Sequence, residues 1–361
     1  MIRLLIGAAV GLAVSLVLTR FLIDWLHRLK IGQPIHEDVP EGHRVKAGTP
    51  TMGGVAIVTA AVVGYLVAHV PHGTVFTRSG LLLLGLVVGA GLVGLLDDWI
   101  KVSQERNLGL NKRTKILGLL LVAVAFSVGL LQLTVVHTTI GLTRFDHPGI
   151  EVGKVGWAVL AVLLIMGTTN AVNLTDGLDG LAAGSASLAF IAYALICFWA
   201  FRYGPNNLTH RVPNIYHVAH ALDLALVSAA MAGACIGFLW WNAHPARIIM
   251  GDTGSLAIGA GLAGVALSTN TQLLLPIVGA LYVAETVSVI LQVGSFRLFH
   301  RRIFRMAPIH HHFEMAPRSG RGDGWPETTV IVRFWILGGL CTMLALGFFY
   351  ADFLRYQGLT L

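Results

Sequence analysis

The chain has 361 residues, of which 55% are hydrophobic and 12% are charged. Soluble proteins average about 25% charged residues, so this composition and the mean hydropathy of +0.73 exclude a water-soluble globular enzyme. The formal net charge is +7. In a membrane protein the basic residues indicate which loops are cytoplasmic, so this charge is not taken as evidence for nucleic-acid binding.

Ten apolar blocks follow one another along the chain, and a helix needs roughly 20 such residues to cross a bilayer. The blocks cover approximately residues 4–23, 52–70, 81–96, 116–136, 157–169, 178–201, 221–241, 255–267, 273–293 and 330–353. We expect the first to be a span and not a cleaved signal, because no small-residue cleavage site precedes Asp24. The fifth and eighth are short, which is typical of spans that border a polar site. These blocks predict an all-α polytopic membrane protein, with one integral membrane domain over residues 1–361.

Basic residues are concentrated in alternate connections between the spans. Seventeen of the 25 Lys and Arg residues lie in or beside odd-numbered connections, and seven lie in the even-numbered ones or at the termini. Because short cytoplasmic loops hold the excess of Lys and Arg, the odd-numbered loops are predicted to be cytoplasmic and both termini extracytoplasmic. Cys197, Cys235 and Cys341 lie inside apolar blocks without a CxxC spacing, so neither a disulfide framework nor a zinc site is expected.

The residues suited to chemistry all fall in the odd-numbered loops. In chain order they are Lys46 and Thr51; Asp97 and Asp98; Asn170, Asn173, Asp176 and Asp179; Asp252; and His310, His311 and His312. This one-sided pattern predicts a single polar site on the cytoplasmic face, built from five loops.

Two acidic motifs are candidates for cation binding or base catalysis. Asp97 and Asp98 close an otherwise uncharged apolar helix, although acidic side chains are unfavourable near a helix C-terminus. A bound cation or a functional base explains this pair better than a hydrated helix end does. Asp252 lies in a glycine-flanked turn and suits Mg²⁺, which takes one or two carboxylates together with substrate phosphates. The alternative for Asp252 is an N-cap of the following helix.

The polar segment 170–180 spaces its acidic and amide side chains by three. On a helical turn Asn173, Asp176 and Asp179 would share one face. Such a face can hold a divalent ion or hydrogen-bond a nucleobase and ribose, and the alternative is a polar loop with a helix cap.

The three consecutive histidines cannot all face one metal on a regular helix, so a trihistidine zinc site is not expected. Phosphate or sugar contacts, or donation to a leaving group, are the favoured roles for His310, His311 and His312, and a solvated surface tract is the alternative. Glu285 lies within the ninth span, where an acid serves either hydrogen bonding in the bundle or support of a site. The glycine patterns Gly85-xxx-Gly89 and Gly233-xxx-Gly237 indicate close helix packing.

Carboxylates, amides and cationic side chains at the inner face of a membrane favour phosphoryl transfer from a nucleotide to a lipid-soluble acceptor, a reaction that depends on positioning and charge neutralisation. A cation-coupled transporter is the competing class, but it would place its acids near the middle of the membrane.

Six motifs in this order resemble those of the phospho-N-acetylmuramoyl-pentapeptide transferase (MraY) family. They are Lys46-Ala-Gly-Thr-Pro-Thr-Met-Gly-Gly54, Asp97-Asp98-Trp99, segment 170–180 (NAVNLTDGLDG), segment 250–255 (MGDTGS), segment 285–295 (ETVSVILQVGS) and segment 306–314 (MAPIHHHFE). The resemblance covers nearly the whole chain.

The resemblance implies ten membrane helices in the bacterial inner membrane. It also implies transfer of phospho-MurNAc-pentapeptide from UDP-MurNAc-pentapeptide to undecaprenyl phosphate, which gives lipid I and UMP with Mg²⁺ as cofactor. A relative that transfers GlcNAc-1-phosphate to a polyprenyl phosphate is the alternative. The partners are then the two substrates and the bilayer, without nucleic acid, and a homodimer is left open.

Residue roles follow from the same resemblance. Asp97 and Asp98 match the aspartate pair, with Asp97 a candidate base on the lipid phosphate, and Asp252 matches the magnesium ligand. Residues that match positions around the nucleotide or in the same cleft are Lys46, Thr51, Lys115, Asn170, Asn173, Asp176 and Asp179, and His310, His311 and His312 match the motif beside the sugar phosphate. Direct attack by the lipid phosphate is expected, and a double displacement through an aspartyl intermediate is left open.

Overall fold

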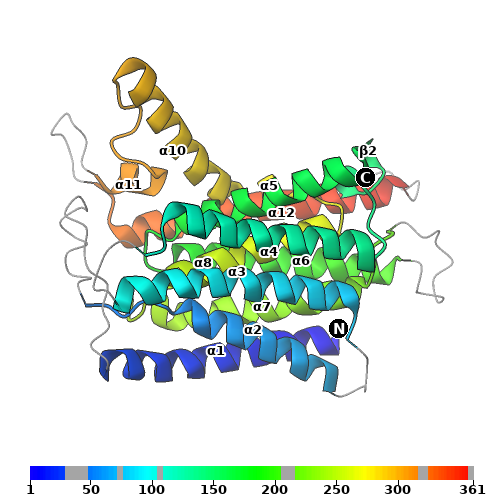
Figure 1. Ribbon diagram of the computed structural model, residues 1–361, viewed down its shortest axis with the longest axis horizontal. Coiled ribbons are helices and arrows are strands. Elements are labelled where there is room, and N and C mark those ends of the chain that lie inside the picture. The colour runs from blue at the N-terminus through cyan, green and yellow to red at the C-terminus, as the bar shows by residue number, and fades with distance from the viewer. Residues whose placement is uncertain (29–47, 71–75, 104–108, 205–215, 316–323, 357–361) are drawn as a thin grey trace.

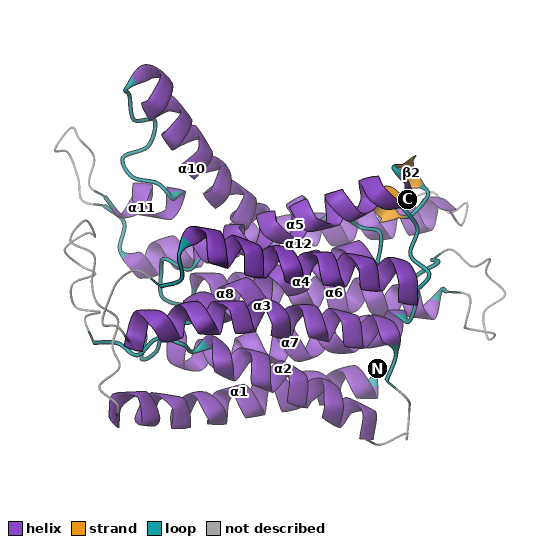
Figure 2. Ribbon diagram, in the orientation of Figure 1, coloured by secondary structure: helices purple, strands orange, loops and turns teal. Residues whose placement is uncertain are grey.

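The computed structural model describes residues 1–28, 48–70, 76–103, 109–204, 216–315 and 324–356 (Figure 1). Helices dominate this part of the chain, and the two strands within it form one antiparallel hairpin (Figure 2). The elements are α1 (Ile2–Arg28), α2 (Gly54–His69), α3 (Arg78–Ser103), α4 (Lys112–Leu133), β1 (Thr139–Arg144), β2 (His147–Glu151), α5 (Gly153–Thr175), α6 (Leu181–Arg202), α7 (Ala221–Asn242), α8 (Gly251–Ser268), α9 (Leu275–Val278), α10 (Ala280–Phe299), α11 (Ile309–Glu314) and α12 (Glu327–Tyr356).

Eight helices of the described part are long and apolar enough to cross a membrane. They are α1, α3, α4, α5, α6, α7, α10 and α12. Their outer faces expose large apolar side chains such as Leu121 and Leu163, which are 71% and 64% exposed. A surface of this kind is stable only in contact with lipid. The prediction of an all-α polytopic membrane protein is therefore confirmed.

Two further helices coincide with predicted spans but differ from the other eight. The α2 helix has 16 residues, and the 18-residue α8 is buried at every position from Asp252 to Ser268. Because α8 contacts only protein, it can carry glycine and polar residues that a lipid-facing helix could not. The shortness predicted for this span is confirmed.

The fifth and ninth predicted spans differ from expectation. The fifth is not short, because α5 continues through its polar end to Thr175, where the Thr168 hydroxyl and the Asn170 amide donate hydrogen bonds back to carbonyl groups of the same helix. The ninth is not continuous, because it breaks at Gly279 into α9 and α10, with Pro276 in the first turn of α9. Beyond the break, α10 leans away from the other helices (Figure 1).

The arrangement of the helices separates two ends of the bundle. The α1 helix begins, and α12 ends, at the end of the bundle where the β1–β2 hairpin lies, whereas α11 lies at the opposite end (Figure 1). The α8 helix connects these ends: its first residues bond to Asp98, and the residues that follow it, Asn270 and Gln272, bond to β1. Helices α3 and α5 pack along α8.

Glycines set the separation of α1 from α7. A Cβ atom at Gly233 would lie 2.0 Å from the Ala8 carbonyl oxygen, and one at Gly237 would lie 2.3 Å from that of Leu12. The packing role predicted for these two glycines is confirmed. Gly85 does not share it, since a Cβ atom there would meet no atom within 4 Å.

We expect Gly233→Ala to destabilise the protein by roughly 1–3 kcal/mol, because the added methyl group would force the α1 and α7 backbones apart. The measurement is thermal unfolding of the purified protein in detergent. Gly85→Ala is the matched control, and it should leave the melting temperature unchanged or raise it, since alanine favours a helix over glycine. Equal melting temperatures for Gly233→Ala and the wild type would refute the close contact.

Candidate active site

A carboxylate of α3 holds the first turn of α8. Asp98 accepts hydrogen bonds from the backbone N–H groups of Asp252 and Thr253, at 3.0 and 2.9 Å, and from the Thr253 hydroxyl at 2.7 Å. The first N–H groups of a helix have no partner within it, and the positive end of the helix dipole favours an anion there. Asp98 thereby fixes the position of Asp252.

Cationic and amide groups from three helices meet the Asp252 side chain. Lys101 of α3 and Lys115 of α4 both place Nζ 2.7 Å from Oδ2, and the Asn173 amide of α5 donates to Oδ1 at 2.5 Å. Asp252 is therefore not an N-cap, and the alternative interpretation of this residue is wrong. Lys115, which the resemblance assigned to the substrate cleft, thus contacts Asp252.

Asp97 completes a cluster of three buried carboxylates. Its Oδ2 lies 2.6 Å from Lys101 Nζ, and its Oδ1 accepts the Leu110 N–H at 3.0 Å. One oxygen atom from each of Asp97, Asp98 and Asp252 can be chosen so that all three lie within 4.8 Å of one another. The three carboxylates outnumber the two lysines that contact them, so two lysines cannot neutralise three ionised carboxylates. Hard oxygen ligands of this kind suit Mg²⁺ rather than zinc. The cluster therefore fits the expected metal, and it is not a hydrated helix end.

We define the acidic loop as residues 176–180, which follow α5. Its two aspartates face different parts of the protein. Asp176 faces the cluster. Its burial, and then the charges of Asp252, Asp98 and Asp179, hold its pKa well above the ordinary value for a carboxyl group. Asp179 bonds away from the cluster, so the prediction that Asn173, Asp176 and Asp179 share one helical face is wrong. The helix ends at Thr175, before that face could form.

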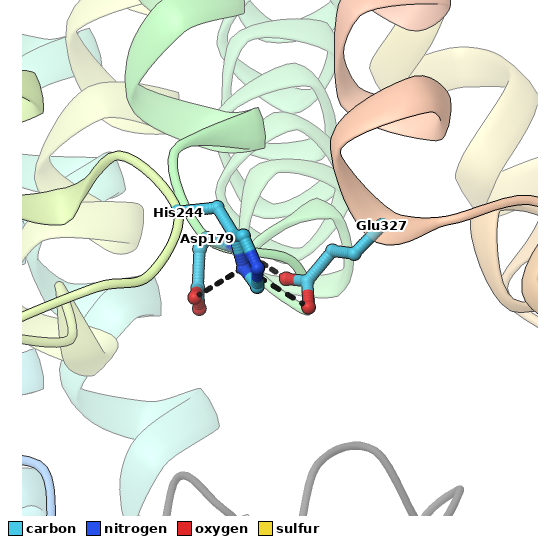
Figure 3. A group of neighbouring side chains, drawn as sticks. All are labelled: Asp179, His244 and Glu327. Atoms are coloured by element: carbon cyan, nitrogen blue, oxygen red, sulfur yellow. Dashed lines mark hydrogen bonds and ion pairs between the residues drawn. The ribbon is translucent and has the colours of Figure 1, made fainter.

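Asp179 is held by three residues from later in the chain. Its Oδ2 lies 3.1 Å from His244 Nδ1 and accepts the Ala246 N–H at 3.0 Å, while its own N–H donates to Glu327 at 3.0 Å. His244 Nδ1 also lies 3.4 Å from a Glu327 oxygen, so the imidazole stands between two carboxylates (Figure 3). This trio joins the acidic loop to the start of α12.

The three histidines of α11 point to three different partners. His310 Nδ1 lies 3.1 Å from Glu285 Oε2, His311 Nδ1 lies 2.6 Å from Glu314, and His312 Nδ1 accepts the Arg305 N–H at 3.1 Å. The three side chains therefore point to three different places and not to one common position. Burial, and then the guanidinium of Arg305, lower the pKa of His312 below its ordinary value. Because Nδ1 accepts the Arg305 N–H, the neutral ring carries its proton on Nε2.

Two more of the predicted site residues, Asn170 and Thr51, make no described contact with the cluster. Asn170 is exposed, and its amide bonds to the Met166 carbonyl of its own helix. Thr51 is buried in a segment whose neighbours Pro50 and Gly53 exchange backbone hydrogen bonds with Ile249, just before α8. Lys46 lies outside the described residues.

The structure adds residues that were not among the predicted site residues. Lys101 contacts all three carboxylates of the cluster, and its spacing of three and four residues from Asp98 and Asp97 on one helix could have revealed it. His244 and Glu327 carry no comparable local signal, because their partner Asp179 lies 65 and 148 residues away.

Comparison with known proteins identifies the family. A model of glycosyl transferase family 4 matches residues 80–270, and a model of the phospho-N-acetylmuramoyl-pentapeptide-transferase signature 1 matches residues 46–58. The phospho-N-acetylmuramoyl-pentapeptide-transferases of Saccharopolyspora erythraea and Frankia alni are each 49% identical to this chain. The first alignment covers 97% of both chains and the second 98% of both. The protein of the same name from Thermobifida fusca is 48% identical over 98% of this chain and 99% of its own length. This chain belongs to the phospho-N-acetylmuramoyl-pentapeptide-transferase family.

In this member of the family, the two matched regions meet at the cluster. The glycosyl transferase family 4 match contains Asp97, Asp98 and Asp252. The signature region ends inside α2, where a Cβ atom at Gly54 would lie 2.0 Å from the Gly254 nitrogen of α8. The signature segment is therefore packed directly against the helix that carries Asp252.

We expect Asp176→Asn to stabilise this family member when substrate and divalent metal are absent. Since folding raises the pKa of Asp176, the folded protein loses stability as pH rises through the ordinary carboxyl range towards the raised pKa. An amide escapes this loss, so the melting temperature in EDTA at pH 7.5 should rise by roughly 2–4 °C. Melting curves from pH 5 to 8 test this, with the exposed Asp24→Asn as control. A lower melting temperature for Asp176→Asn at pH 7.5 would contradict the prediction.

Proposed function

We propose that this chain transfers phospho-MurNAc-pentapeptide from UDP-MurNAc-pentapeptide to undecaprenyl phosphate, forming lipid I and UMP. The convergence on Asp252 carries the proposal: Lys101, Lys115 and Asn173, from α3, α4 and α5, all contact one carboxylate at the end of the bundle where the acidic loop lies. The names of the relatives and the family signature support the same activity.

The acidic cluster is the proposed site of Mg²⁺. Asp252 would hold the ion, with the carboxylates of Asp97 and Asp98 within reach of the same position. When bound, Mg²⁺ would neutralise charge on the substrate phosphates. Lys101 and Lys115 contribute further positive charge beside the same phosphates, and phosphoryl transfer depends chiefly on such positioning and charge.

Asp97 is the proposed base for the attacking lipid phosphate. It takes the proton of a protonated lipid phosphate, and an oxygen atom of that phosphate attacks the β-phosphorus of the UDP-sugar. The bond between the β-phosphorus and the bridging oxygen breaks, and UMP leaves with that oxygen. Asp98 already accepts three hydrogen bonds from the start of α8 and is therefore assigned to positioning Asp252.

The remaining site residues are assigned to the UDP-sugar. Asn173 and Asp176 lie at the cluster, and Asp179 lies on the adjoining side of the acidic loop. His310, His311 and His312 are placed beside the sugar phosphate. Lys46, Thr51 and Asn170 keep their proposed nucleotide contacts only through the resemblance, because no described contact joins them to the cluster.

We also infer the topology of this transferase. With α2 and α8 added to the eight long apolar helices, ten helices cross the membrane as one integral domain over residues 1–361. The excess of Lys and Arg in odd-numbered loops favours termini outside and the active site on the cytoplasmic face of the bacterial inner membrane. Both substrates would then reach the cluster from the inner leaflet and the cytoplasm.

Release of UMP by the purified protein in detergent tests the function. With undecaprenyl phosphate, Mg²⁺ and UDP-MurNAc-pentapeptide, we expect UMP in amounts that exceed the enzyme many times over. EDTA should stop the reaction. UMP from UDP-GlcNAc alone would instead assign the chain to the GlcNAc-1-phosphate transferases, and no UMP from either donor would favour the transporter class. UMP formed without lipid, in an amount equal to the enzyme, would contradict direct attack.

We expect Asp252→Ala to abolish turnover and leave the protein folded. Removal of this carboxylate deletes the proposed metal ligand and leaves Lys101 and Lys115 without their shared partner. The UMP assay and the melting temperature, measured on the same preparation, separate lost chemistry from lost structure. Asp146→Asn, which changes an exposed carboxylate of the distant hairpin, is the control and should keep full activity. Residual turnover of Asp252→Ala above one tenth of the wild type would remove Asp252 from the site.

A further inference from the structure

Glu285 is a completely buried carboxylate in the second turn of α10. Its side chain is 0% exposed, as is that of His310, and Oε2 lies 3.1 Å from the Nδ1 atom of that histidine. The same oxygen atom lies 3.4 Å from the His310 backbone nitrogen, which donates to it. The other oxygen atom of Glu285, Oε1, has no hydrogen-bond partner among the described residues, and burial of such a carboxylate oxygen is costly. This pair lies outside the cluster of three aspartates.

The other ring nitrogen of His310 points to the acidic loop. Neither ring nitrogen of His310 forms a hydrogen bond with the described residues: Nδ1 lies within ion-pair distance of Glu285, and Nε2 faces the acidic loop. A Cβ atom at Gly177 would lie 2.5 Å from Nε2. The ring therefore packs directly on the backbone of residue 177, between Asp176 and Asp179. Glycine is needed at this position because any side chain would displace the imidazole.

His310 is distinguished from its two neighbours by this contact. His311 pairs with Glu314 of the same short helix, and His312 bonds to the Arg305 backbone in the preceding connection. The His310 ring is held by Glu285 of α10 while it contacts the acidic loop. Glu285 accepts the His310 backbone N–H and lies within ion-pair distance of Nδ1, so it restricts both the backbone and the ring of this histidine and thus the direction of Nε2.

We propose that Glu285 is a positioning residue, which sets the His310 ring against Gly177 and so fixes the acidic loop for the UDP-sugar. The chain of contacts runs from α10 through α11 to the backbone between the two aspartates assigned to that substrate. This inference rests on the proposed function, because its effect is read in the use of UDP-MurNAc-pentapeptide. Replacement of a residue that merely joins two helices would change the KM for both substrates and would also lower the stability of the bundle.

Steady-state kinetics of Glu285→Gln tests the proposal. The amide keeps the size of the side chain and removes its charge, so the ring loses its fixed orientation while the packing is kept. We expect kcat/KM for UDP-MurNAc-pentapeptide to fall on the order of 10- to 100-fold, through a raised KM. The KM for undecaprenyl phosphate and the melting temperature should stay close to the wild type. Glu151→Gln is the matched control, since it removes the same charge from an exposed position on β2.

Gly177→Ala perturbs the same contact between His310 and the acidic loop, but at the glycine and not at the glutamate. The added methyl group would displace His310 Nε2 without touching Glu285, so the same rise in KM for the UDP-sugar is expected. If both substitutions act through this one contact, the double variant should lose little more than the weaker single variant, because coupled effects do not multiply. Gly85→Ala is the control for adding a methyl group to a glycine with open space around it.

The outcomes separate this inference from the proposed function. A wild-type protein without lipid-dependent UMP release would overturn the function itself. If the wild type is active, unchanged kinetics in Glu285→Gln, or losses in the two single variants that multiply in the double variant, would overturn the positioning role. Equal rises in KM for both substrates with a lowered melting temperature would assign Glu285 to bundle packing. Should Glu285→Gln fail to fold, the KM split in Gly177→Ala alone decides between the two roles.

Discussion

The carboxylate of Asp98 is the contact on which the rest of the site depends. A helix that is buried along nearly its whole length must satisfy its first N–H groups inside the protein, because no water reaches them. In α8 two of these groups donate to Asp98 of α3. That single interaction closes the helix end, compensates the buried charge of Asp98 and determines where the neighbouring Asp252 lies. The lysines and the asparagine from other helices then meet a carboxylate whose position is already fixed.

Glycine is the second constraint, because it allows the backbones to approach closely enough for this contact. A Cβ atom at Gly94 would lie 2.3 Å from the Asp252 carbonyl oxygen, and one at Gly54 would lie 2.0 Å from the Gly254 nitrogen. Helices α3 and α2 therefore approach α8 without side chains between the backbones, as small residues permit in membrane bundles. The polar site is the direct result of this close apolar packing.

Much of the site could be predicted from the sequence because its motifs are local. The blocks of hydropathy predicted the spans, and Asp97, Asp98, Asn173 and Asp252 were recognised from residue type and side of the membrane. The pairing of Asp179 with His244 and Glu327 could not be predicted, since no spacing relates residues so far apart. The prediction that Asn173, Asp176 and Asp179 share one face was wrong for another reason. The helix ends at Thr175, so the later side chains no longer follow helical spacing.

The separation along the chain of Asp98 from its partners has a consequence for biosynthesis. The acceptor in α3 and the N–H donors of α8 are 154 and 155 residues apart, so α3 enters the membrane with a carboxylate that no helix end yet satisfies. Its last turns must stay near the hydrated surface until α8 has been made. In the same way α1 packs both on α2, which follows it directly, and on α7, and its contact with α7 can form only after α7 has been made. Assembly of the bundle is therefore ordered by translation, with the central helix inserted among neighbours that preceded it.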